Sequence, residues 1–245
     1  MTLSVERFDQ RERSEAFRRA IGIDAFPPWL LHGDPDSDVY WDRVRSWFPE
    51  LQIVLVDDGE PVASAWGVPL RWTGAVADLP GGYTDSLRRA VLGREQGVAA
   101  DALVVCAAVV VPGRARTGLA GELLRAMRDL PAAAALQHVV VPVRPTGKAA
   151  FPLVDIDAYA SWTRDDGLPL DPWLRTHVRI GGRILGTAPA SQVLRAPVAA
   201  WEAWTGTAFR TTGDHVVPGG LAPLRIDLAA DLCTMTEGNV WVQHR

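Results

Sequence analysis

The feature that most constrains this chain is the junction at residues 109–124, where an apolar segment meets a short basic turn and then an amphipathic pattern. Residues 109–111 are three valines, which favour a strand, and apolar residues recur at helical spacing from residue 119 to residue 130. The turn between them holds two glycines and two arginines. The first N–H groups of a helix have no intrahelical acceptor and lie at the positive end of its dipole. The junction therefore predicts an anion site, and the pyrophosphate of a nucleotide-bearing cofactor is its expected occupant.

The apolar pattern on either side of this junction predicts alternating strands and helices in one domain, 1–245. The segments at 102–111 and 138–143 are continuously apolar, which predicts buried strands that lie parallel across the intervening helix. The other expected strands are Leu3–Val5, a hairpin of 51–56 and 61–72, Trp173–Leu185 and Asn239–Gln243. The other expected helices are 15–20, Pro35 to about Trp47 after an Asp34 cap, one capped by Thr84 or Asp85, 155–163 and 197–204.

Composition excludes several classes of protein. The chain is 48% hydrophobic and 22% charged with a net charge of −4, which is typical of a globular protein and predicts neither a nucleic-acid surface nor an anionic-membrane surface. No apolar run is long enough to span a bilayer, and the N-terminus has no apolar signal core, so a cytoplasmic location is expected. The two cysteines, Cys106 and Cys233, have neither zinc-site nor disulfide spacing, and no metal is expected.

The junction also carries a short family motif. Pro112, Gly118, Ala120 and the pair Leu123-Leu124 stand in the register of the motif of the GNAT acyltransferases, the acetyl-CoA-dependent N-acetyltransferase superfamily, which the chain resembles. The order of the expected elements over residues 1–185 resembles that family as well, which implies a core at 1–185 and a C-terminal elaboration at about 186–245 that completes the sheet. One position departs from the motif: Ala115 stands where the family usually has Arg or Gln, and Arg114 and Arg116 flank it.

The resemblance implies a mixed α/β fold, with a central, largely antiparallel sheet that splays between two adjacent parallel strands and carries helices on both faces. It implies that the pantetheine arm of acetyl-CoA or another acyl-CoA lies in the splay and that the turn wraps the pyrophosphate. The cofactor-binding residues implied in this way are Val109, Val110, Val111, Arg114, Ala115, Arg116, Thr117, Gly118, Leu119, Ala120 and Gly121.

Acyl transfer to an amine requires a polarised carbonyl, a base, and an acid for the departing thiolate. By resemblance, the backbone N–H near Val110 or Val111 polarises the carbonyl, and Tyr159 is the acid; the alternative for Tyr159 is a core tyrosine with a hydrogen-bonded hydroxyl.

The base is sought among the histidines. If 173–185 is a strand, its period of two places Arg175, His177 and Arg179 on one face. Two flanking cations would lower the pKa of His177 and suit it to act as the base, and the arginines would bind an anionic group of the substrate. The alternative for His177 is a surface histidine; His215 is a second candidate base, and His244 belongs to no recognisable constellation.

The expected function is direct transfer of an acetyl or other acyl group from acyl-CoA to a small-molecule amine in a ternary complex. One alternative is the same fold with other chemistry, either transfer from a carrier-protein thioester or decarboxylation. Another is a non-enzymatic sensor of CoA ligands. A third is an NAD(P)-binding protein that uses the loose pattern Gly113-x-Ala115-x-x-Gly118, with Arg144 near a 2′-phosphate. The identity of the acceptor and a homodimeric state stay open.

Overall fold

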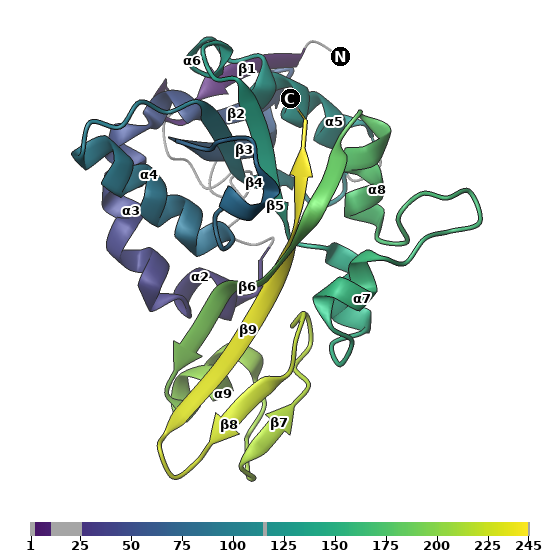
Figure 1. Ribbon diagram of the computed structural model, residues 1–245. Coiled ribbons are helices and arrows are strands. Elements are labelled where there is room, and N and C mark those ends of the chain that lie inside the picture. The colour runs from purple at the N-terminus through teal and green to yellow at the C-terminus, as the bar shows by residue number, and fades with distance from the viewer. Residues whose placement is uncertain (1–2, 11–25, 115–116, 245) are drawn as a thin grey trace.

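The computed structural model describes residues 3–10, 26–114 and 117–244. Helices and strands alternate along the chain, as the apolar pattern predicts (Figure 1). The strands are β1 (Leu3–Arg7), β2 (Gln52–Asp57), β3 (Glu60–Leu70), β4 (Ala102–Val110), β5 (His138–Val143), β6 (Arg183–Ala196), β7 (Gly213–His215), β8 (Leu224–Asp227) and β9 (Leu232–Gln243). The α-helices are α2 (Pro28–His32), α3 (Pro35–Trp47), α4 (Tyr83–Glu95), α5 (Leu119–Arg128), α6 (Pro131–Ala134), α7 (Ile156–Ala160), α8 (Pro172–Arg179) and α9 (Val198–Thr205). Four 3₁₀ turns in the described residues lie at Phe8–Gln10, Pro49–Leu51, Val76–Asp78 and Thr146–Ala150. The helix expected at 15–20 lies outside the described residues.

One mixed sheet organises the molecule. Its described strands follow the order β1-β2-β3-β4-β5-β9-β8-β7, and β6 pairs with β9. Every pairing is antiparallel except that of β4 with β5, which α5 connects. The expected class, a mixed and largely antiparallel sheet with one parallel pair at its centre, is therefore confirmed.

The parallel pair is short. Only Ala102–Val104 of β4 pair with His138–Val140 of β5, although both strands continue beyond these residues. From Val140 onward, the other edge of β5 pairs with β9. The two strands therefore separate where they approach the turn at residues 112–118, and the edge of β4 that faces β5 is left open there.

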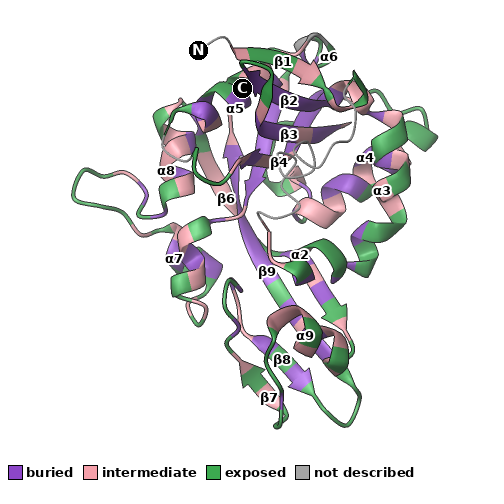
Figure 2. Cartoon of the chain, turned by 180° about the vertical axis from the view of Figure 1, so that it is seen from behind, coloured by how far each residue is buried: buried purple, intermediate pink, exposed green. Residues whose placement is uncertain are grey.

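Helices cover the sheet, and its inner strands are buried on both sides (Figure 2). In β2, Ile53 and Leu55 belong to the main hydrophobic core, whereas Val54 and Val56 pack on the other side with Phe8. In Figure 1, α3 and α4 lie to the left of the open edge and α5 and α8 to its right, and Figure 2 shows the same arrangement from behind.

Local signals set the ends of the helices. As predicted, α3 begins after Asp34, whose side chain accepts a hydrogen bond from Ser37 N at 3.1 Å, and has a proline at its first position. The prediction that Thr84 or Asp85 caps α4 is wrong. The cap is Gly82, with φ +141°, and a Cβ at Gly82 would lie 2.3 Å from Ser191 Cα. This close approach to β6 requires glycine.

The strand predicted over Trp173–Leu185 is wrong. Residues Pro172–Arg179 form α8, and a turn then leads into β6, which starts at Arg183. The side chain of Asp171 caps α8 by accepting hydrogen bonds from Trp173 N and Leu174 N, at 2.8 and 2.9 Å. An Asp-Pro helix start therefore prevails over the alternation that suggested a strand.

The C-terminal segment supplies a central strand of the sheet. The strand expected at Asn239–Gln243 is the end of β9, which lies between β5 and β8 and also pairs with β6. The far ends of β6 and β9, together with α2, α9, β7 and β8, enclose a second hydrophobic cluster that includes Trp29, Trp201 and Met235 (Figure 1, lower part).

Candidate functional site

The turn before α5 has the geometry of an anion site. Gly113 and Gly118 have φ of +87° and +86°, a conformation that favours glycine, and no atom of the described residues lies within 4 Å of a Cβ built at either position. The N–H groups of Gly121 and Glu122 return to Gly118 O at 3.0 and 3.2 Å. Within the described part of the turn, this leaves the N–H groups of Leu119 and Ala120 as the open donors at the positive end of α5. Two expected cofactor residues, Ala115 and Arg116, lie outside the described residues.

A cavity of about 1710 Å³ lies beside this turn. Its walls come from the separated strands, through residues 105–108 and Val110 of β4 and residues 141–144 at the end of β5, and from one face each of α3 and α8. Of the expected cofactor residues, those that line it are Val110, Arg114, Gly118, Leu119, Ala120 and Gly121. Val109, Val111 and Thr117 do not line it. The cavity therefore joins the anion site to the open edge of β4.

The backbone of β4 identifies which N–H group faces the cavity. In an antiparallel ladder, the N–H groups of alternate residues point to the same neighbouring strand. Val111 N–H donates to Val62 O at 3.0 Å, so the N–H of Val109 also points to β3, and the N–H of Val110 points away from it. Of the two donors that the resemblance offered for the carbonyl, Val111 is therefore excluded and Val110 remains.

Cys106 lies at a bulge in β4. Trp66 pairs with Ala107 and Gly67 pairs with Val105, so Cys106 has no partner in β3. Its side chain lines the cavity, which the sequence did not predict. Burial raises the pKa of the Cys106 thiol, which therefore stays protonated near neutral pH and is a poor nucleophile.

The predicted arginines of α8 lie beside the anion site. The side chain of Ile180, directly after α8, is 3.5 Å from a Cβ built at Gly121 in the first turn of α5. Arg175 and Arg179 are four residues apart on one helical face, and both line the cavity. Arg175 Nη1 donates to Pro169 O and Leu170 O, whereas Arg179 is exposed. Their position favours the phosphate end of a cofactor over an acceptor substrate.

The structural argument for His177 as the base is wrong. His177 is on a helix, where it lies on the side opposite Arg175 and Arg179; it is fully buried and does not line the cavity. Its Nδ1 lies 2.8 Å from Nε2 of His244, and no described residue forms a hydrogen bond with its Nε2. Burial, with a smaller effect of His244, lowers the pKa of His177 to about 3. The second candidate, His215, contacts Thr211 O at 2.9 Å and also lies outside the cavity lining.

The predicted acid, Tyr159, also lies outside the cavity lining. It is a buried residue of α7, and its hydroxyl donates to Asp171 Oδ2 at 3.1 Å. The same oxygen accepts a hydrogen bond from Gly147 N at 2.7 Å. Burial, followed by the charge of Asp171, raises the pKa of the Tyr159 hydroxyl. This hydroxyl connects α7 to the cap of α8 and does not line the cavity.

A different tyrosine lines the cavity. Tyr83 begins α4, and its ring is 6.0 Å from that of Trp66 in an edge-on arrangement. Burial raises the pKa of its hydroxyl well above the usual value, and Cys106, Asp34 and Asp38 contribute further. Tyr83 is therefore placed between the bulge of β4 and the start of α3. No motif in the sequence distinguishes it from the other tyrosines.

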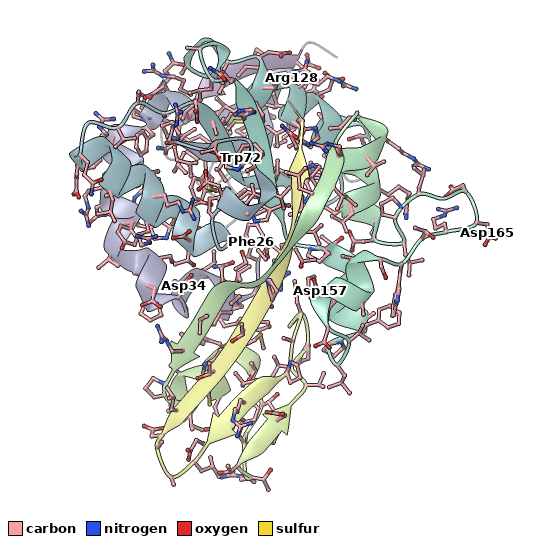
Figure 3. The ribbon with its side chains drawn as sticks, in the orientation of Figure 1. Phe26, Asp34, Trp72, Arg128, Asp157 and Asp165 are labelled. Atoms are coloured by element: carbon pink, nitrogen blue, oxygen red, sulfur yellow. The ribbon has the colours of Figure 1, made fainter. Side chains whose placement is uncertain are left out.

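The wall formed by α3 is aromatic and acidic. Asp38, Trp41 and Asp42 lie on one face of this helix and line the cavity. The ring of Trp41 is 4.7 Å from that of Trp66 on β3. Figure 3 labels Asp34, which caps the start of α3, and Phe26, a cavity-lining residue that precedes α2. The helical spacing of these residues is visible in the sequence, but their orientation toward the cavity is not.

Arg144 forms an ion pair with the buried carboxylate of Glu237. Its Nε and Nη2 donate to the two carboxylate oxygens of Glu237 at 2.7 and 2.8 Å, and Glu237 is 1% exposed. The guanidinium is thus neutralised by the protein, which removes the reason for expecting it at a 2′-phosphate. Among the described residues, no group of three or more His, Cys, Asp or Glu side chains could hold a metal ion, and no helix is long and apolar enough to cross a membrane.

Comparison with known proteins agrees with this geometry. No protein-family model matches the chain. The chain is 27% identical over 244 residues to arginine N-acetyltransferase avaD of Aspergillus versicolor, and the match covers 89% of this chain and 84% of that protein. The loading GNATL domain of CurA from Lyngbya majuscula has a similar fold, with a TM-score of 0.57 at 15% identity over 99% of this chain and 97% of that one. The GphF GNAT-like decarboxylase in complex with isobutyryl-CoA is also similar, with a TM-score of 0.53 at 19% identity over 98% of each chain. The chain is therefore similar in sequence to an N-acetyltransferase and has the fold of GNAT-like proteins.

Proposed function

We propose that the protein transfers an acetyl group from acetyl-CoA to the amine of a small molecule. The observation that carries this proposal is the cavity that joins the first turn of α5 to the open edge of β4. It offers backbone donors for a pyrophosphate at one end and an unpaired strand edge for an extended, amide-bearing arm. Arginine is the first acceptor to test, because the curated relative is named as an arginine N-acetyltransferase.

The residues divide between the two ends of the cofactor. The N–H groups of Leu119 and Ala120 would bind the pyrophosphate, and the exposed guanidinium of Arg179 would lie near the phosphates. The arm would run along β4 towards its bulge. Val110 N–H would donate to the thioester carbonyl oxygen, where negative charge develops during transfer.

The transfer would be direct. The neutral amine attacks the thioester carbon, a C–N bond forms and the C–S bond breaks, and the proton that the amine loses balances the one that the leaving thiolate gains. Tyr83 lines the cavity near the β4 bulge and keeps its proton because burial raises its pKa, so we propose that its hydroxyl donates a hydrogen bond to the leaving thiolate. A cysteine relay is not part of the proposal, since the Cys106 thiol is held in its protonated form.

The test combines wild-type protein with acetyl-CoA and arginine, and measures released thiol together with the mass of the product. We expect one free CoA for each acetylated arginine. A parallel reaction with malonyl-CoA and no amine tests the alternative chemistry, since a decarboxylase would release CO₂ and acetyl-CoA. Decarboxylation without transfer to any amine would contradict the proposal, and so would the absence of both reactions.

Arg179→Ala tests the cofactor end, with Arg164→Ala as its control because Arg164 is also exposed but lies outside the cavity lining. We expect the Kd for CoA to rise about fivefold in Arg179→Ala, which corresponds to ~1 kcal/mol. An equal Kd in the two variants would remove Arg179 from the cofactor site.

A further inference from the structure

One buried acceptor in the wall of the cavity has no donor among the described residues. Asn239 lies on β9, is 3% exposed and lines the cavity. Its Nδ2 donates to Pro142 O at 2.7 Å, which sets the orientation of the amide, and its Oδ1 has no hydrogen-bond partner in the part of the chain that the structure describes. Burying a carbonyl oxygen without a donor costs free energy, so native proteins rarely do so without a reason. A ligand that presents an N–H group to Asn239 would remove this cost.

The surroundings of Asn239 favour the acceptor over the cofactor arm as the source of that N–H group. Asn239 is on β9, which lies beyond β5 from the edge of β4 along which the arm is proposed to run. Glu237, two residues earlier on the same face of β9, already neutralises Arg144. A cationic ligand beside Asn239 therefore does not meet an unpaired positive charge from that arginine.

A second position for a cation lies on α3. Asp38 lines the cavity with an exposed carboxylate that forms no ion pair among the described residues. Asp42 is different, because Arg45 pairs with it at 2.7 Å. Trp41, one turn after Asp38, presents its ring to the same cavity next to Trp66. A carboxylate beside aromatic rings is a common arrangement for binding an ammonium or guanidinium group.

We propose that Asn239 and Asp38 select an acceptor with two nitrogen groups. Asn239 Oδ1 accepts a hydrogen bond from the reacting amine, and the Asp38 carboxylate, with the ring of Trp41, binds a second, cationic group. The substrate class is then diamines and amines that carry a guanidinium. This inference rests on the proposed acetyl transfer and goes further by assigning two residues to the recognition of the acceptor.

The experiment on Asn239 compares two substitutions. Asn239→Leu removes the acceptor and also the bond to Pro142, whereas Asn239→Asp loses the donor to Pro142, adds a negative charge and keeps an acceptor. We expect Asn239→Leu to raise KM for arginine about tenfold, with the Kd for CoA within about twofold of wild type. Asn239→Asp should keep KM for arginine within about threefold. Equal rises in the two variants would mean that only the Pro142 bond matters, and a loss of CoA affinity would assign Asn239 to the cofactor; either result overturns the inference.

The experiment on Asp38 uses substrates of matched length, 1,4-diaminobutane and butylamine. Asp38→Asn should raise KM for the diamine about tenfold and leave KM for butylamine unchanged, because only the diamine carries the second cation. Asp36→Asn is the control: it removes the same charge from the same helix, but the Asp36 carboxylate pairs with Arg195 and lies outside the cavity lining. An equal effect of Asp38→Asn on both amines would overturn the assignment. If wild-type protein acetylates no amine at all, the proposed function itself fails, which is distinguishable from an active enzyme insensitive to these substitutions.

Discussion

The buried histidine pair predicts that the protein loses stability in mild acid. His177 is fully buried, and burial together with His244 lowers its pKa to about 3. In the unfolded chain the pKa of a histidine is about 6.5. The native state therefore excludes a proton that the unfolded state binds. The stabilising effect is complete above pH 6.5 and is lost progressively as the pH falls from 6.5 towards 3.

The size of this effect follows from the two pKa values. For one histidine with a native pKa of about 3 and an unfolded pKa of about 6.5, the free energy of unfolding falls by about 2 kcal/mol between pH 7 and pH 5. Burial also lowers the pKa of His244, with a smaller effect of Arg128, so this histidine adds a further loss of the same sign.

The assay is urea unfolding of wild-type protein and His177→Leu at pH 7 and pH 5. The substitution lowers stability at both pH values because it leaves His244 Nε2 without its partner, so the quantity to compare is the difference between the two pH values. We expect this difference to be about 2 kcal/mol smaller in His177→Leu than in wild type. His32→Gln, at an exposed position on α2, is the control and should retain the wild-type difference.

An unchanged pH difference in His177→Leu would refute this reasoning. The same variant tests the role that the sequence suggested for His177. Because the side chain does not line the cavity, we expect kcat at pH 7.5 and a temperature well below the Tm to stay within about threefold of wild type. A fall of about a hundredfold or more in a folded variant would restore His177 as the candidate base.

Two further predictions concern the framework around the site. Glu237→Leu should lower the free energy of unfolding by about 3–5 kcal/mol, measured by urea unfolding, because it leaves the guanidinium of Arg144 without its carboxylate; a loss below about 1 kcal/mol would contradict the importance of this buried pair. Gly82→Ala should strongly reduce the Tm, because φ at Gly82 is +141° and the new Cβ would lie 2.3 Å from Ser191 Cα. In Gly93→Ala, in the interior of α4, the new Cβ would have only one described neighbour, at 4.0 Å, and the substitution should stabilise the helix by about 0.5–1 kcal/mol. Similar changes in Tm for the two glycine variants would contradict the close approach of β6 to the cap of α4.

The anion end of the site is predictable from sequence because it is local. The valine strand, the glycine turn and the helix follow one another within residues 109–124, and each has a pattern of its own. The continuous apolar segments at 102–111 and 138–143 similarly predict the parallel pair on which the splay depends. The strand predicted in place of α8 is wrong for a local reason too, because the Asp171-Pro172 helix start prevails over the alternation of side chains that follows it.

The rest of the site depends on contacts between distant parts of the chain. His177 and His244 are 67 residues apart, and no spacing rule connects them. Asn239 faces the cavity because β9 crosses the sheet next to β5, which the sequence of β9 does not specify. Tyr159 was assigned by resemblance alone, and its hydroxyl is bound by Asp171 through an arrangement that only the tertiary structure reveals.

The central claim is that the cavity binds CoA through its phosphates at the start of α5. The most direct test is calorimetric titration of the wild-type protein with CoA, pantetheine and NADPH under the same conditions. We predict saturable binding of CoA with 1:1 stoichiometry, binding of pantetheine weaker by about tenfold or more because it has no phosphate for Leu119 and Ala120 N–H, and no binding of NADPH. Equal affinity for CoA and pantetheine would contradict the phosphate site, and binding of NADPH without CoA would contradict the account as a whole.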